Sequence, residues 1–149
     1  MNQITTRIAT LLDVDILAPM FDAYRVFYEQ ESDLEAASAF LRERMKLGES
    51  TIILAEIENE LVGFTQLYPI FSSVSIQRSL LLNDLYVVEK YRSQGIATRL
   101  LTESKKYAKK LNFKGLSLAT AIDNPAQKLY EREGWMKDDG FFHYFWNVS

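Results

Sequence analysis

Strand-like segments recur along the chain as short stretches in which apolar and polar residues alternate or apolar residues follow one another. This pattern predicts strands at residues 4–8, 51–57, 61–68, 80–88 and 115–120, with a closing pair at 135–137 and 141–146. The residues 58–60 between the second and third strands predict a hairpin turn. Pro69 is expected to end the third strand, and the serine-rich residues 72–79 are expected to form a loop.

Helices are marked by apolar residues at three- and four-residue spacing and by capping residues. A first helix is expected after a cap at Asp13 or Asp15, with an apolar face of Leu17, Met20, Phe21, Tyr24 and Tyr28. A second helix is expected to begin at a capping box in residues 32–35 and to stop at Gly48, with Leu34, Ala37, Leu41 and Met45 on one face. A third follows Gly95, with Ile96, Leu100, Leu101, Ser104, Ala108 and Leu111 along one side. A fourth begins at Asn124-Pro125 and ends at Gly134.

The order of these elements predicts an α/β fold. Strand-to-strand hairpins alternate with helical crossovers, and this combination builds a mixed sheet rather than a purely parallel one. With 149 residues, and with no linker or repeat in the sequence, the whole chain from 1 to 149 is expected to form a single domain.

Composition excludes several kinds of chemistry. There is no cysteine, so disulfides, thiolate metal sites and a cysteine nucleophile are ruled out, and one histidine cannot build a multi-histidine metal site. A net charge of −3 argues against a nucleic-acid partner and is compatible with cationic substrates. No apolar run is long enough to span a membrane and no signal peptide is evident, so the chain is expected to be cytoplasmic.

The central stretch, residues 81–111, places a strand, a polar turn and a helix N-terminus in succession. The first amides of a helix lack intrahelical partners and lie at the positive end of its dipole, so they attract phosphate. Gly95 and Ala97 would let an anion approach the backbone, and Arg92 can add a charged fork. Neither a P-loop nor a G-x-G-x-x-G fingerprint is present. The stretch therefore predicts a pyrophosphate site.

Two motifs give the sequence a family resemblance. Arg-x-x-Gly-x-Ala at residues 92–97 and Asn-x-Ala-x-x-Leu-Tyr-x-x-x-Gly-Trp at residues 124–135 resemble the GNAT superfamily of N-acetyltransferases. The likeness covers nearly the whole chain and implies a three-layer fold, with a mostly antiparallel sheet flanked by about four helices. Residues 83–87 and 24–29 also resemble a subgroup related to a yeast acetyltransferase of histones and polyamines.

The resemblance implies acetyl-CoA as co-substrate and no metal. Direct attack of an amine on the thioester is expected, with a small-molecule amine, a peptide lysine or a peptide N-terminus as acceptor. The residues implied to hold acetyl-CoA are Leu85, Tyr86, Val87, Arg92, Ser93, Gln94, Gly95, Ile96, Ala97, Thr98, Asn124, Ala126 and Tyr130.

Catalytic residues are also implied by the resemblance. Tyr130 matches the tyrosine that in many relatives protonates the departing thiolate. For the general base, some relatives carry a glutamate where this chain has Asn83, which cannot accept a proton. Asp84 is the catalytic candidate in its place, and Glu29 and Glu31 are alternatives.

The acceptor pocket is expected from the first two helices and the facing strands. Aromatic rings beside carboxylates suit a cationic amine. The expected lining is Tyr24, Phe27, Tyr28, Glu29 and Glu31, with Phe64, Gln66 and Tyr68 as further candidates. His143 is expected to pack in the last strand.

Two alternatives to this enzyme remain open. The chain could be a non-catalytic acyl-CoA sensor, which the replacement of a glutamate by Asn83 would favour. Residues 141–146 could instead pair with another chain, which would also explain the expected homodimer.

Overall fold

The chain folds into two compact units, Met1–Ala119 and Thr120–Ser149. A computed structural model describes residues 3–148. The first unit contains β1 (Ile4–Ile8), α1 (Val14–Phe27), α2 (Leu34–Lys46), β2 (Thr51–Ile57), β3 (Glu60–Ser72), β4 (Gln77–Val87), α3 (Ile96–Lys110) and β5 (Leu116–Ser117). Single 3-10 turns lie at Leu11–Asp13 and Glu89–Tyr91, and the second unit contains α4 (Gln127–Arg132).

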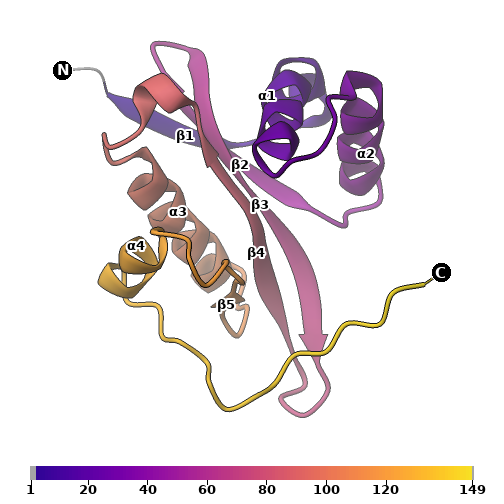
Figure 1. The fold of residues 1–149 in the computed structure, drawn as a ribbon, viewed down its shortest axis with the longest axis vertical. Helices are drawn as coiled ribbons and strands as arrows, with labels where there is room; N and C mark the ends of the chain where they lie inside the picture. Colours follow the sequence, from indigo (N-terminus) through magenta and orange to yellow (C-terminus); the bar gives the residue numbers. More distant parts are fainter. Residues whose placement is uncertain (1–2, 149) are drawn as a thin grey trace. The chain divides into compact units, whose positions relative to one another are not determined.

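The first unit has three layers built around one sheet. The strands follow the order β1-β2-β3-β4-β5, and every neighbouring pair is antiparallel except β4 and β5, which run parallel. Helices α1 and α2 cover one face of this sheet and α3 covers the other (Figure 1). The predicted mixed, mostly antiparallel α/β architecture is therefore confirmed.

Alternation along the strands sends successive side chains into two cores. On one face, Ile52, Leu54 and Phe64 pack with buried residues of α1 and α2. On the other face, α3 packs closely over Gly63: an added Cβ would lie 3.4 Å from the Ile96 side chain and 3.5 Å from the Leu100 side chain. It would also lie 2.8 Å from the carbonyl oxygen of Tyr86 on β4. Of the residues predicted along one side of α3, Ile96, Leu100, Leu101, Ser104 and Ala108 are buried, whereas Leu111 follows the end of the helix and is exposed.

Strands β3 and β4 form a longer hairpin than predicted. Pro69 does not end β3, which continues to Ser72, and β4 begins within the expected loop at Gln77. Pro69 lies opposite Leu80, and the Leu80 N–H donates to the carbonyl oxygen of Gly115 on the β5 side. Because the backbone groups of Leu80 face β5, this pair forms no hydrogen bonds between β3 and β4, and the proline nitrogen faces away from β4. Pairing with β2 stops at Leu67, so no neighbouring strand needs a hydrogen bond from Pro69.

The closing pair of strands predicted at 135–137 and 141–146 is wrong. The described residues after β5, up to residue 148, contain no strand. Strand propensity becomes a strand only beside a pairing partner, and β5, with only two residues, is the last strand of the sheet. His143, expected to pack in a sheet, is exposed, as are its aromatic neighbours.

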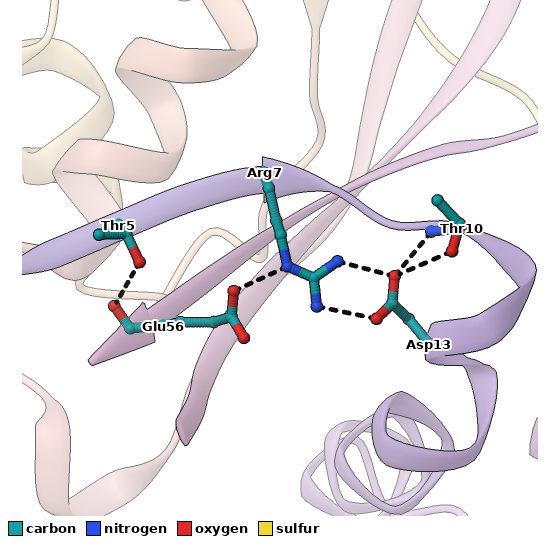
Figure 2. A network of polar contacts seen from close by, with 5 residues as sticks. All are labelled: Thr5, Arg7, Thr10, Asp13 and Glu56. Atoms are coloured by element: carbon teal, nitrogen blue, oxygen red, sulfur yellow. Dashed lines mark hydrogen bonds and ion pairs between the residues drawn. The ribbon is translucent and has the colours of Figure 1, made fainter. Parts of the chain in front are cut away.

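Two helix starts differ in detail from the predicted caps. Asp13 precedes α1, but its carboxylate accepts hydrogen bonds from Arg7 and the Thr10 N–H rather than capping that helix (Figure 2). Arg7 also donates to Glu56, and the network joins β1, β2 and the start of α1. At α2, the cap is Asp33, not Ser32, whose hydroxyl donates to Asp22 on α1 at 2.6 Å.

Candidate active site

The C-terminal half of β4 has one hydrogen-bonding edge without a strand partner among residues 3–148. Beside β5, β4 is paired only at Leu80 and Leu81. The Val88 N–H donates to the carbonyl oxygen of Val62 on β3, so the backbone groups of Val88 face β3. Along an antiparallel pair, the backbone groups of successive residues face the partner strand and the opposite edge in turn. The backbone groups of Leu85 and Val87 therefore face the open edge. This edge offers the hydrogen-bonding groups of a strand to an extended ligand.

A turn rich in outward-facing amides follows this edge directly. Ser93 and Gly95 have positive φ angles of 62° and 86°, and α3 then begins at Ile96. No side chain caps these first amides and the first turn of α3 carries no acidic residue. Ser93, Gln94 and Gly95 are exposed, and a Cβ built on Gly95 meets nothing within 4 Å. The geometry fits the predicted pyrophosphate site, because free amides and a helix dipole point into open space.

Arg92 is held at the base of the turn. Its Nε donates to the carbonyl oxygen of Val87 at 2.8 Å. Its guanidinium carbon lies 5.5 Å from the ring centres of both Phe27 and Tyr86. One nitrogen thus fixes the group to the open edge of β4, while the rest of the fork can bind an anion. Ala97 and Thr98 are half-buried in the first turn of α3, and the Ile96 side chain belongs to the core.

A cavity of about 400 Å³ lies on the face of the sheet covered by α1 and α2. It is lined by Phe21, Tyr24, Arg25, Ala36, Ala37, Phe40, Tyr68, Asn83 and Asp84. Asp84 borders the cavity, and the next residue, Leu85, turns its backbone to the open edge. One strand therefore carries a ligand-sized cavity with several polar groups in its wall next to an edge suited to an extended ligand.

Asp84 is the buried acid of this cavity, with only 2% of its surface exposed. Burial raises the pKa of its carboxyl above the usual range, although hydrogen bonds from Gln66 and Asn83, at 2.5 and 2.7 Å, oppose the rise. A carboxylate that is harder to keep charged is a better proton acceptor near neutral pH. Asp84 thus has the properties of a general base.

Two tyrosines share the cavity with Asp84. Burial and the charge of Asp84 raise the pKa of both Tyr24 and Tyr68 beyond the usual tyrosine range, so both hydroxyls stay protonated. The Tyr24 hydroxyl donates to the backbone oxygen of Asn83 at 3.3 Å. Its ring packs edge-on against Phe64 and Tyr86, which fixes the wall of the cavity.

The expected acceptor residues separate into two groups. Tyr24 and Tyr68 line the cavity, and Phe64 and Gln66 are fully buried in the sheet beneath them. Phe27, Tyr28, Glu29 and Glu31 are exposed and do not line it. Helix α1 ends at Phe27, which carries the later residues into the loop. Sequence reasoning missed Arg25, Phe21 and Phe40, although the spacing of Phe21, Tyr24 and Arg25 places all three on one face of α1.

The second unit holds the remaining predicted site residues. Asn124 accepts a hydrogen bond from the Ala126 N–H at 2.9 Å and so begins the predicted helix turn. The Tyr130 ring packs edge-on against the Trp135 ring with centres 6.1 Å apart, and the backbone N–H of Trp135 donates to the Tyr130 carbonyl oxygen. Gly134 ends the helix with a φ of 89°.

Residues 3–148 contain neither a metal-ligand cluster nor a membrane-spanning helix. Within that range no group of three or more His, Cys, Asp or Glu side chains could hold a metal ion. None of its helices has the length and apolarity needed to cross a lipid bilayer.

An open strand edge that leads into an anion-binding turn is typical of proteins that hold an extended, phosphorylated ligand. The Acetyltransferase (GNAT) family matches residues 17–135 of the chain, and the chain belongs to that family. It is 48% identical over 143 residues to YhfO of Bacillus subtilis (strain 168), described as an uncharacterized N-acetyltransferase, with 95% of this chain and 96% of that protein covered.

Solved structures share this fold. The crystal structure of a probable acetyltransferase, 41% identical, superposes with a TM-score of 0.92 over 97% of this chain and 98% of that one. A predicted acetyltransferase of Clostridium acetobutylicum, crystallised with acetyl-CoA, is 16% identical and covers 96% of each chain with a TM-score of 0.77. The predicted GNAT fold is thereby confirmed.

Proposed function

We propose that this chain is an N-acetyltransferase that moves an acetyl group from acetyl-CoA to a primary amine by direct attack in a ternary complex. The observation that carries the proposal is the arrangement on β4. The strand joins an open edge and a turn with uncapped, exposed amides to a cavity that holds the buried acid Asp84. No other nucleophile is required, because the amine itself attacks the acyl carbon.

The residues of the turn are suited to the phosphates of coenzyme A. The uncapped amides from Ser93 to Thr98 can bind a pyrophosphate, and Arg92 adds charge beside them. The outward groups of Leu85 and Val87 can hydrogen-bond an extended pantetheine as a strand would. When bound, acetyl-CoA supplies a thioester whose carbonyl carbon accepts the amine.

Asp84 is proposed to take the proton from the incoming ammonium, directly or through water, because its raised pKa favours proton uptake. An outward N–H of β4 is proposed to stabilise negative charge on the carbonyl oxygen. Tyr130 is proposed to protonate the departing thiolate, and the sequence motif of residues 124–135 supports this role. Asn124 and Ala126 are proposed to contact the cofactor on the same ground.

The test is release of free thiol from acetyl-CoA with a panel of amines, including spermidine, amino acids and a histone-tail peptide. We expect release with at least one amine and a loss of about 100-fold in kcat for Tyr130→Phe, since general acid–base groups contribute about 100- to 10,000-fold. Tyr144→Phe, an exposed tyrosine of the same unit, is the matched control and should keep full activity.

Three other results would contradict parts of the proposal. Tight binding of acetyl-CoA without thiol release on any amine would favour a non-catalytic acyl-CoA sensor. Equal rates for Tyr130→Phe and the Tyr144→Phe control would remove Tyr130 from the mechanism. Absence of acetyl-CoA binding would refute the assignment of the β4 edge and the turn.

A further inference from the structure

The cavity on the α1 and α2 face carries two opposite charges from different elements. Asp84 comes from β4, and Arg25 comes from the last part of α1. The rest of the polar lining is neutral: Tyr24, Tyr68 and Asn83. An acceptor pocket for a simple cationic amine needs an acid but has no use for a guanidinium.

Arg25 has no carboxylate partner among the described residues. Arg7, Arg42, Arg44 and Arg99 each lie within 4 Å of an acidic side chain, whereas no such pair involves Arg25. Its Nη1 is buried and has no hydrogen-bond partner within residues 3–148. A buried charged donor left unpaired costs free energy, so its presence in a cavity wall points to an anionic group on the ligand.

The acid one turn earlier on α1 does not fill this role. Asp22 accepts a hydrogen bond from the Ser32 hydroxyl at 2.6 Å and another from the Asp33 N–H at 2.8 Å, one on each oxygen. These bonds are the main reason that the pKa of Asp22 is lowered, and the charge of Arg25 adds only a smaller effect. Asp22 thus ties α1 to the start of α2 and leaves the Arg25 fork unpaired.

Other charges near the cavity disfavour a polycation. Glu29 and Glu31, the carboxylates expected to attract one, do not line the cavity. Arg44 lies close enough for its charge to oppose the rise in the Tyr68 pKa, and it stacks on the cavity residue Phe40 at 5.1 Å. Two guanidinium groups and one buried acid therefore favour a ligand that carries one positive and one negative group.

We propose that the acceptor is a small amine that also carries a carboxylate, such as an amino acid, with its carboxylate bound by Arg25 and its amine directed to Asp84. A cavity of about 400 Å³ is of the size that holds such a molecule. The rings of Phe21, Phe40 and Tyr24 supply apolar walls for its side chain. This assignment rests on the N-acetyl transfer proposed above and names its substrate class.

The experiment compares matched acceptors that differ only in the carboxylate. Each amino acid in the thiol-release panel is paired with its amide and with its decarboxylated amine. The parent protein should turn over at least one free amino acid with a kcat/KM at least tenfold above that of both partners. An amide, a decarboxylated amine or spermidine that equals or exceeds every free amino acid would overturn the proposal.

Variants of Arg25 separate recognition from folding. Arg25→Gln should raise the KM for the amino acid at least tenfold, leave the KM for acetyl-CoA unchanged and remove the advantage over the decarboxylated amine. Arg25→Lys should restore part of the preference for the amino acid over the decarboxylated amine, because lysine keeps the positive charge but lacks the two-pronged guanidinium group. Arg42→Gln, on the exposed side of α2, is the control. An equal effect of Arg25→Gln on the acid and on its decarboxylated amine would refute the role of Arg25.

A binding measurement keeps this proposal separate from the proposed function. Calorimetry with the preferred amino acid and desulfo-coenzyme A should show binding that Arg25→Gln weakens at least tenfold. If acetyl-CoA bound but no amine released thiol, the proposed transfer would fail, while binding that depends on Arg25 would keep the assignment of the carboxylate site. If no amino acid bound, the zwitterion assignment would fail even where another amine was acetylated.

Discussion

The proposed pyrophosphate site at the turn before α3 can be tested by comparing two glycines that share a left-handed backbone conformation. Gly95 has a φ of 86° and Gly48, after α2, has a φ of 67°. A Cβ added at either position meets nothing within 4 Å, so alanine causes no clash at either site. Each substitution should therefore cost only the strain of a left-handed alanine, about 1–2 kcal/mol.

This cost sets the stability result for both variants. At about 2–4 °C per kcal/mol for a chain of this size, Gly48→Ala and Gly95→Ala should each lower Tm by about 2–8 °C, and by similar amounts. Thermal unfolding without ligand measures this directly. A much larger loss at Gly95 would indicate packing around the turn that the open space at this position argues against.

Binding should distinguish the two variants. In Gly95→Ala the new methyl group points into the space proposed for the pyrophosphate and should cost at least one amide-to-phosphate hydrogen bond. Bonds to charged groups contribute about 1.5–3 kcal/mol, so the affinity for coenzyme A should fall about 10- to 100-fold. Gly48→Ala should bind as the parent does. Equal affinities of the two variants in calorimetry would refute the pyrophosphate site at this turn.

Three further predictions follow from other parts of the first unit and from the C-terminal segment. Gly63→Ala places a methyl group 2.8 Å from the Tyr86 carbonyl oxygen and should destabilise the fold by about 1–3 kcal/mol in urea unfolding, more than Gly48→Ala. Arg7 is the main reason that the Asp13 pKa is lowered to about 2, so the stability from this pair is present above pH 4 and lost as the pH falls toward 2. Because the Arg7 side chain is 42% exposed, solvent screening limits this contribution to about 1 kcal/mol. Asp13→Asn should therefore lower the free energy of unfolding by about 1 kcal/mol at pH 7 and leave it unchanged at pH 2. Asp15→Asn, whose parent side chain is 90% exposed, is the control and should not lower the free energy of unfolding at either pH. Truncation after Asp139 removes the exposed aromatic residues 141–146 and should convert the expected homodimer into a monomer in gel filtration, while an unchanged elution volume would exclude this segment from the interface.

Local patterns predicted the elements whose partners are close in sequence. The spacing of Ile96, Leu100 and Ala108 gave the buried face of α3, and Gly95 marked its start, because helix periodicity and left-handed backbone are local properties. The turn follows from the same short stretch, whereas the open edge of β4 depends on β5, which pairs with it only at Leu80 and Leu81. The last strands were mispredicted because β-rich residues need a pairing strand, and no local pattern says whether one is available.

The lining of the cavity proposed for the acceptor differs from the expected lining for another reason. Phe27, Tyr28, Glu29 and Glu31 were chosen for their chemistry at the end of a helix, but Glu29 has a φ of 65° and lies beyond that end. The residues that line the cavity repeat at helical spacing from Phe21, and this spacing includes Arg25. Helix phase places Phe21, Tyr24 and Arg25 on the face that lines the cavity, whereas residue type alone favours residues of the following loop.

The position of the Asp84 side chain depends on a β-bulge in β4, which the alternation of side chains along a regular strand does not predict. Gln66 pairs with Asp84 and Leu67 pairs with Leu82, so Asn83 is an extra residue on β4. In a regular strand Asp84 would share the face of Leu80 and Leu82, which pack toward α3, and a carboxylate would be buried in an apolar core. The bulge turns Asp84 to the other face, beside Tyr24 and Tyr68, and the Asn83 side chain donates to its carboxylate. An acid at a position that alternation assigns to the core is itself a signal of such a bulge, and here it marks the base of the proposed reaction.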